Sequence, residues 1–293
     1  MNSNPRIDYR LSSSAPKLSA PAGKPIIVHV IVNLEYWPFD KKMPRALGSS
    51  PHGITPQPDV LNFSWYEYGM RCGMPRFLRA LGDRGLKASC AINAGVIDVY
   101  PECAAAVAES KWELIGHCYE QRALTRDTEA DVISRTVNRI LQFTGQPVNG
   151  WLGSGLVETD ATPELLFSEG IRYVCDWGLD DLPVRLKTEQ GHLVAMPSSC
   201  ALDDGLVFGI ETRPSDEMYT RLTSTLRVFE DETKDNPRII TIGLHPHLMG
   251  EPHRFYYLER MLDDLTGRGD TVFMTGTEIL DWFERQSPLG DGG

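Results

Sequence analysis

The chain has 293 residues, 41% of them hydrophobic, and a formal net charge of −11 at pH 7. This length is enough for one large α/β domain, or two modest ones, with a sizeable core. The negative charge argues against nucleic acid and against an anionic membrane surface as the main partner. The sequence has no apolar run near the roughly 20 residues that cross a bilayer, so we expect no membrane partner.

The N-terminus and the cysteines bear on the compartment. Residues 1–24 are rich in Ser, Pro and Ala and lack the continuous apolar stretch of a secretory signal, so we expect an N-terminal arm. The six cysteines are widely spaced and none forms a C-x-x-C pair, which favours reduced thiols. Both features predict a cytoplasmic protein.

The first predicted elements are a strand, a long loop and a helix. The segment from Pro25 to Leu34 is rich in β-branched residues, which predicts a buried strand of a mostly parallel sheet. Residues 36–63 hold five prolines, and a loop of this length is typical of a lid or binding loop. Ser64 is a candidate N-cap of a helix that is kinked near Pro75 and ends at Gly85.

The rest of the chain alternates between strands and helices, which predicts a single α/β domain over residues 25–288, either barrel-like or doubly wound. Thr125 can cap a helix that Gly145 ends, and Ser215 can cap another. Segment 177–213 breaks the alternation and is expected to hold loops with a hairpin. The other predicted strands are 87–94, 112–116, 171–175, 238–244 and 271–274; the helices are 102–110, 125–143, 162–169, 215–233, 253–267 and 276–286.

Polar residues follow the predicted strands at five places. Functional groups of parallel sheets collect at the carboxyl ends of strands, so these places predict an active site. The apolar neighbours of Glu35 are expected to desolvate its carboxylate and to raise its pKa. In chain order the five places hold Asn33, Glu35 and Tyr36; His117, Glu120 and Gln121; Trp151 and Ser154; Asp176, Trp177, Asp180 and Asp181; and His245 with His247.

The segment Gly116-His117-Cys118-Tyr119-Glu120-Gln121 is the most informative of these places. It follows a short apolar run and is expected to precede a helix. A metal site here would usually need a second imidazole one helical turn after His117. That position is Gln121, whose neutral amide is a poor ligand for a metal such as zinc. The sequence therefore favours a hydrolase pocket that holds no metal.

His245 and His247 leave a metal-binding alternative open. In an extended strand, residues two apart point the same way, so both imidazoles would join Glu35 and His117 around a metal. Pro246 between them marks the end of the strand, which argues against a common direction.

Other candidates also have a structural alternative. Glu67 and Arg71 lie four residues apart on a predicted helix, which suits either a surface ion pair or a clamp beneath the loop, with Glu67 near the reacting centre. The pair Asp180-Asp181 suits a solvated turn or helix cap as well as a binding site. Trp151 is either a packing residue or a wall for the substrate.

Taken together, these segments resemble the polysaccharide deacetylase superfamily, and within it the metal-independent allantoinases and the related cyclic imide hydrolases. The resemblance implies a distorted (β/α) barrel with mostly parallel strands, and a homo-oligomer, often a tetramer. Sugar deacetylases of this superfamily hold a metal with one Asp and two His, but here Asn33-Leu34-Glu35 and Gln121 depart from that pattern. The matching stretches are VNLE (32–35), YEYGMRCG (66–73), GHCYEQ (116–121), GW (150–151), DDLP (180–183) and IGLHPHLMGEPHR (242–254).

The resemblance implies hydrolysis of a small cyclic imide with no metal cofactor. Ring opening then needs a general base, oxyanion donors and orientation of the substrate. Three alternatives remain: an allantoinase acting on a cyclic ureide, a metal-dependent deacetylase of amino sugars, and a non-catalytic relative. The expected roles are Glu35 or Glu67 as base, His117 and His245 as proton donors or carbonyl-polarising groups, Gln121, Asp180 and Asp181 as hydrogen-bonding partners of the ring, Arg71 as a clamp, and Tyr66, Trp151 and Trp177 as walls around a flat ring.

Overall fold

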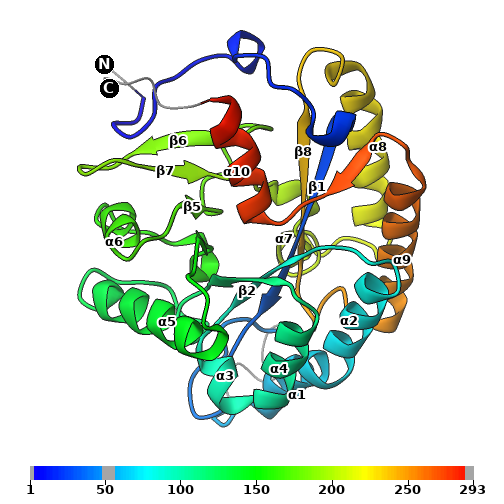
Figure 1. The fold of residues 1–293 in the computed structure, drawn as a ribbon. Helices are drawn as coiled ribbons and strands as arrows, with labels where there is room; N and C mark the ends of the chain where they lie inside the picture. The colour runs from blue at the N-terminus through cyan, green and yellow to red at the C-terminus, as the bar shows by residue number, and fades with distance from the viewer. Residues whose placement is uncertain (1–2, 48–56, 288–293) are drawn as a thin grey trace.

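A curled, mostly parallel β-sheet forms the centre of the protein (Figure 1). The computed structural model describes residues 3–47 and 57–287. In these residues the strand order is β6-β7-β5-β4-β3-β2-β1-β8, with β9 also paired to β1, and β6–β7 is the one antiparallel pair. The strands are β1 (Ile26–Leu34), β2 (Ser89–Ile92), β3 (Glu113–Gly116), β4 (Gly150–Trp151), β5 (Tyr173–Val174), β6 (Val184–Lys187), β7 (His192–Ala195), β8 (Arg238–Leu244) and β9 (Thr271–Phe273).

Strand β1 sets the geometry of the active-site edge. Its sequence IIVHVIVNL is buried along the whole strand, as expected for a strand covered on both faces. It pairs in parallel with β2 and β8, and β2 pairs in parallel with β3. The register sets Leu34 and Gly116 opposite Ile92. Strands β1, β3 and β8 therefore end at one edge of the sheet, next to the residues that follow them: Glu35, His117 and His245.

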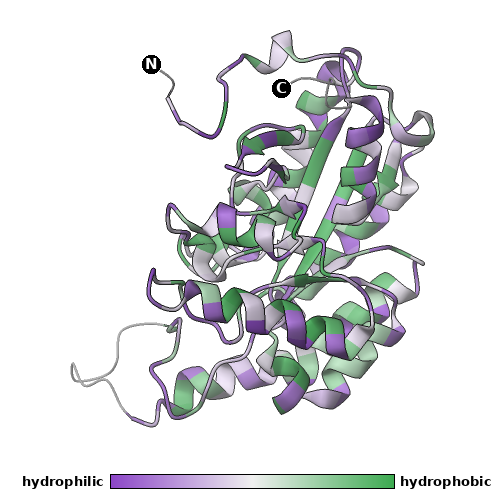
Figure 2. Ribbon diagram, turned by 60° about the vertical axis from the view of Figure 1, so that its left-hand side comes forward, coloured by the Kyte–Doolittle hydropathy of each residue, from purple (hydrophilic) through white to green (hydrophobic). Residues whose placement is uncertain are grey.

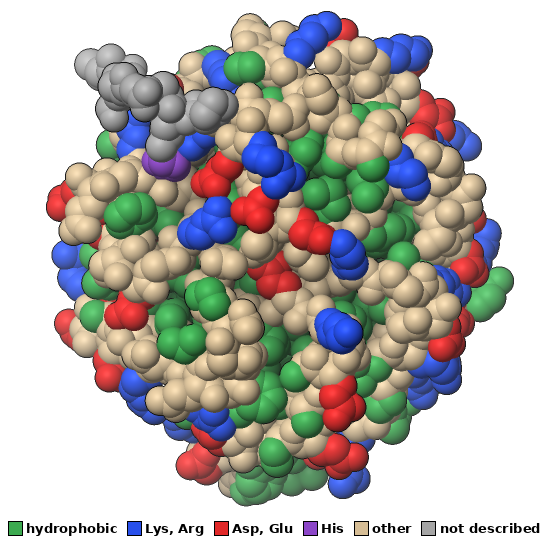
Figure 3. All heavy atoms as spheres, viewed as in Figure 1, with side chains coloured by type: hydrophobic (Ala, Val, Ile, Leu, Met, Phe, Trp, Pro, Cys, Tyr) green, Lys and Arg blue, Asp and Glu red, His purple; other side chains and the backbone are tan. Residues whose placement is uncertain are grey.

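Helices surround this sheet, and hydrophobic residues concentrate on the central strands (Figures 1 and 2). Acidic and basic side chains are interspersed over the face in Figure 3. No helix of the described residues has the length and apolar character to cross a bilayer. The helices are α1 (Val60–Tyr68), α2 (Met74–Gly82), α3 (Gly95–Val99), α4 (Pro101–Glu109), α5 (Glu129–Thr144), α6 (Thr162–Ser168), α7 (Asp204–Val207), α8 (Glu217–Glu232), α9 (Pro252–Gly267) and α10 (Gly276–Gln286).

The predicted caps of three helices are wrong. Helix α1 begins before Ser64, and its N-cap is Asp59, which accepts a hydrogen bond from the backbone of Asn62. Helix α5 begins four residues after Thr125, because residues 125–128 form a turn that precedes it. Helix α8 follows Asp216 rather than Ser215. The left-handed Gly145 at the end of α5 is confirmed, with φ 67°.

The junction between α1 and α2 is a π-helical turn, Gly69–Gly73, and Pro75 lies in the first turn of α2 rather than at an interior kink. The two glycines of this turn leave no room for a side chain. A Cβ on Gly69 would overlap the backbone of His247, and a Cβ on Gly73 would overlap the carbonyl of Pro246. The helices therefore pack directly against the turn that follows β8.

The chain after His117 is not helical: residues 117–128 form bends and turns before α5 begins. Gln121 is therefore not one helical turn from His117, and the predicted spacing argument is wrong in its geometry. The hairpin predicted in 177–213 is confirmed as β6–β7, and the same segment adds the short helix α7. In the predicted arm, the carbonyl of Arg6 accepts a hydrogen bond from Lys187 at the free edge of β6.

Candidate active site

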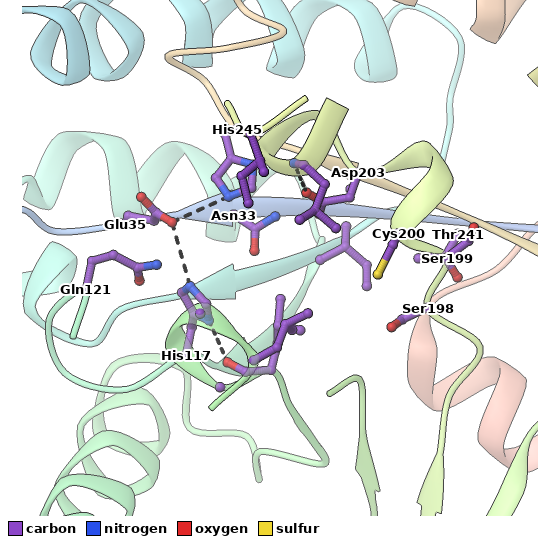
Figure 4. A pocket seen from close by; sticks show the side chains of 18 of the residues that line it. Asn33, Glu35, His117, Gln121, Ser198, Ser199, Cys200, Asp203, Thr241 and His245 are labelled. Carbon is purple, nitrogen blue, oxygen red and sulfur yellow. Dashed lines mark hydrogen bonds and ion pairs between the residues drawn. The ribbon is translucent and has the colours of Figure 1, made fainter. Parts of the chain in front are cut away.

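A cavity of about 270 Å³ opens where β1, β3 and β8 end (Figure 4). Five of the residues predicted at strand ends line it: Asn33, Glu35, His117, Gln121 and His245. The other side of the cavity is formed by residues 198–200 and by the segment around α7. Its size suits a small molecule better than several units of a polymer.

Glu35 lies at the floor of the cavity and is 5% exposed. Its Oε2 accepts a hydrogen bond of 2.6 Å from the indole of Trp37. Its Oε1 lies 3.4 Å from Nε2 of His245 and 4.0 Å from Nε2 of His117. The backbone carbonyl of Glu35 accepts a further bond, 2.7 Å long, from the hydroxyl of Tyr66. Both the side chain and the backbone of Glu35 are therefore held in place.

The imidazole of His245 determines the charge of Glu35. Burial alone would raise the pKa of its carboxyl, but the hydrogen bond and the positive charge of His245 lower that pKa well below its usual value. The expectation that apolar neighbours would raise the pKa of Glu35 is therefore wrong, because imidazole nitrogens face the carboxylate. Glu35 is an anion at neutral pH.

His117 presents one ring nitrogen to the cavity. Its Nδ1 lies 2.5 Å from the carbonyl of Leu152, and a carbonyl only accepts, so Nδ1 carries the hydrogen. In the neutral ring Nε2 is then an acceptor. This atom is buried and has no hydrogen-bond partner among the described residues. A buried acceptor without a partner is uncommon in native proteins and points to a ligand or water at this position.

His245 forms a buried charge pair with Asp204 of α7. Its Nδ1 lies 2.5 Å from Oδ1 of Asp204, and the other oxygen of Asp204 accepts from the backbone N–H groups of His245 and Met249. Burial would lower the pKa of His245, but Asp204 and Glu35 raise it well above its usual value. His245 is thus an imidazolium held between two carboxylates.

The donor set does not fit the divalent metal that the fold family implies. Among the described residues, Asp203, Asp204 and His245 offer ligand atoms within 4.8 Å of one another. Most of these groups are already engaged: Asp204 bonds to His245 and to two backbone N–H groups, and Oδ1 of Asp203 accepts from the backbone N–H of Leu206 at 3.0 Å. Binding a metal here would break the charge pair.

Gln121 reaches the cavity through the loop after His117. Its backbone N–H donates to the carbonyl of Tyr36 at 2.9 Å, and its amide oxygen accepts from Ser154 at 3.0 Å. The amide NH₂ is then the donor that Gln121 retains for a substrate.

Seven of the residues to which the sequence analysis gave a catalytic or binding role do not line this cavity. Glu67 instead accepts from Tyr100 and pairs with Arg71, whose side chain is 76% exposed. Tyr66 stacks on Trp37 with ring centroids 4.8 Å apart. Asp180 and Asp181 line a neighbouring cavity, and Trp151 and Trp177 line neither.

Trp151 and His247 have packing roles. The ring of Trp151 is fully buried and packs against Gly116 of β3, where an added Cβ would lie 2.5 Å from the ring. His247 does not face the cavity with His245, because the chain turns after β8. Its ring lies against Trp37 and Trp65, with centroids 5.0 and 4.8 Å away, and burial lowers its pKa to about 3.

Several residues of the site were missed by the sequence reasoning. Asp203 and Asp204 lie in the segment expected to be loops, and the only signal was two adjacent acids before a glycine. Arg45 lies in the predicted lid, of which residues 48–56 are outside the described residues. Three further cavity residues, Ser198, Ser199 and Cys200, follow β7 without a distinctive pattern.

Comparison with known proteins supports the class of fold. No family model matches the chain. A Schizosaccharomyces pombe protein named "Putative polysaccharide deacetylase" is 22% identical over 246 residues, which cover 77% of each chain. A crystal structure of a probable polysaccharide deacetylase from Pseudomonas aeruginosa PAO1 aligns with a TM-score of 0.82 and 22% identity, over 94% of this chain and 96% of the other.

A crystal structure of PuuE allantoinase gives the same TM-score, 0.82, with 20% identity over 97% of this chain and 100% of the other. The chain therefore has the α/β barrel fold of the polysaccharide deacetylase type.

Proposed function

We propose that this protein is a hydrolase that opens the ring of small cyclic imides by breaking a C–N bond, without a catalytic metal. The observation that carries the proposal is the array Glu35, His117, His245 and Asp204 at the floor of a small cavity. Two solved structures of the same fold are named an allantoinase and a probable polysaccharide deacetylase, and both names describe hydrolases.

The gap between Glu35 and His117 suits the attacking water. Oε1 of Glu35 and Nε2 of neutral His117 are both acceptors, and they face each other across 4.0 Å. A water molecule has two O–H groups and can donate one to each. His117 then acts as the base, because its Nε2 has no partner among the described residues and can take up a proton, whereas the lowered pKa of Glu35 makes that carboxylate a weak base.

His245 provides the acid on the other side of Glu35. Attack of water on one carbonyl carbon places negative charge on the carbonyl oxygen, which the imidazolium stabilises. The C–N bond then breaks and the nitrogen takes up a proton, which gives a half-amide with one new carboxylate. The second carbonyl spreads charge from the leaving nitrogen, and Gln121 has a free amide donor to bind it.

The substrate class is tested by an assay of purified protein on succinimide, maleimide, a hydantoin, allantoin and N-acetylglucosamine oligomers. We expect turnover of the imides at least about tenfold above that of the ureides. Faster hydrolysis of allantoin would identify the cyclic ureide alternative, which the similarity to an allantoinase structure supports. Release of acetate from the amino sugar oligomers, without imide turnover, would contradict the proposal.

A further inference from the structure

One cationic side chain in the cavity has no part in the hydrolytic steps. Arg45 is the one Lys or Arg among the described residues that line the cavity. Its Nη1 donates to the carbonyl of Gly205 at 2.5 Å. No carboxylate oxygen of the described residues lies within 4.0 Å of its guanidinium, which is the limit for an ion pair. A guanidinium has five N–H donors, so most of its hydrogen-bonding capacity remains.

The fold makes room for this guanidinium. A Cβ on Gly209 would overlap Nη1 of Arg45, and a Cβ on Gly205 would lie 3.2 Å from it. Two glycines four residues apart, in α7 and the turn after it, thus leave the space that Arg45 fills. The same Cβ position on Gly205 lies 3.0 Å from Cε1 of His245, so the cation is held close to the reacting groups.

Asp203 and Arg45 both lie beside Gly205, but one oxygen of Asp203 is already engaged. Its Oδ1 accepts from the backbone N–H of Leu206, which caps α7. Leu206 and Ile210 belong to the same segment and give this side of the cavity an apolar surface. A half-buried guanidinium beside apolar side chains suits an anionic group on a short hydrocarbon linker.

We infer that Arg45 binds a carboxylate carried by the substrate, so that the preferred substrates are cyclic imides with a carboxylate substituent on the ring. This inference rests on the proposed function of the same site. Arg is suited to this role because its planar fork matches a carboxylate with two parallel hydrogen bonds.

The kinetic test compares succinimide carrying a carboxymethyl group with its methyl ester. For the wild type we expect the carboxylate substrate to have the lower KM. Arg45→Met should raise that KM about 10- to 100-fold, the range for a hydrogen bond to a charged group, and change the ester by less than about threefold. Lys42→Met is the matched control, since Lys42 is exposed on the same segment and its loss changes net charge equally. Equal effects of Arg45→Met on both substrates would overturn the inference.

A binding measurement separates this inference from the proposed function. Cyclopentanecarboxylate and cyclopentanecarboxamide are rings with no imide bond to hydrolyse, and calorimetry gives their affinities. We expect the carboxylate to bind at least about tenfold tighter to the wild type and this preference to vanish in Arg45→Met. This result without imide turnover would retain the role of Arg45 and reject the reaction. No preference in the wild type would reject the role of Arg45, whatever the enzyme hydrolyses.

Discussion

Glu35 and Asp176 are two carboxyl groups at the same end of the barrel, and their environments drive them in opposite directions. Glu35 follows β1 and faces the imidazolium of His245, which lowers its pKa well below its usual value. Asp176 follows β5 and lies beside Glu158. Burial and this second carboxyl raise the pKa of Asp176 well above its usual value.

The hydrogen bonds of the two groups differ as well. Glu35 has the Trp37 indole as a donor, whereas Oδ2 of Asp176 and both oxygens of Glu158 are buried without a partner among the described residues. Burial is common to both places, so the neighbours decide which carboxyl stays charged. Glu35 is therefore suited to chemistry that needs an anion, and Asp176 to holding a proton.

The largest loss of activity is expected when Glu35, the charged carboxyl of the two, is replaced. Glu35→Gln keeps the shape but removes the charge that orients water and holds His245 as an imidazolium. We expect kcat for succinimide to fall about 10²- to 10⁴-fold, and His117→Ala to cause a loss in the same range. A loss below about threefold in either variant would remove that residue from the mechanism.

Replacement of Asp204 tests whether the imidazolium of His245 acts as the acid. Asp204→Asn removes a carboxylate that raises the pKa of His245, so His245 should lose its proton at a lower pH. We expect kcat at pH 7 to fall roughly 10- to 100-fold and the alkaline limb of the kcat/KM profile to move down by about one pH unit or more. The profile between pH 5 and 10 measures this shift. An unchanged alkaline limb would show that His245 does not act as the acid.

Asp176 should affect stability rather than turnover. Its pKa is raised in the folded protein, so the folded state binds more protons than the unfolded state, and stability falls as pH rises above about 4, the usual pKa of Asp. The variant Asp176→Asn has no ionisable group at this position, so its stability should fall less as pH rises. The difference in Tm between the variant and the wild type should therefore increase, in favour of the variant, between pH 4 and 8.

Thermal unfolding at several pH values tests this stability effect, with a shift of roughly 2–4 °C for each kcal/mol. The kcat of Asp176→Asn should stay within about threefold of the wild type. A Tm difference that does not depend on pH would contradict the raised pKa of Asp176.

The smallest effect is expected when zinc is added to the variant Gln121→His. Gln121→His introduces the imidazole that a metal-binding relative would use, but the loop after His117 does not place this residue one helical turn away. We expect no gain in imide turnover on adding zinc to this variant. A zinc-dependent increase above the wild-type rate would show that the site favours a metal after all.

The sequence predicted those parts of the molecule in which local pattern and tertiary structure agree. The β-branched runs of β1 and β8 are of this kind, and they placed Glu35 and His245 at strand ends. The bounds of α10 were predicted for the same reason. Asp204 escaped prediction because α7 has four residues, too few for a helical pattern. The lowered pKa of Glu35 escaped because it depends on an imidazole 210 residues away in the sequence, that of His245.

The central claim is that Glu35, His117 and His245 hydrolyse a cyclic imide without a metal. Its most direct test is the rate of succinimide hydrolysis by protein stripped with a chelator, with bound metal measured on the same sample. We predict a kcat within about twofold of the untreated protein, and the same loss of about 10²- to 10⁴-fold in Glu35→Gln with and without chelator. Activity that disappears with the metal and returns in proportion to added zinc would contradict this account.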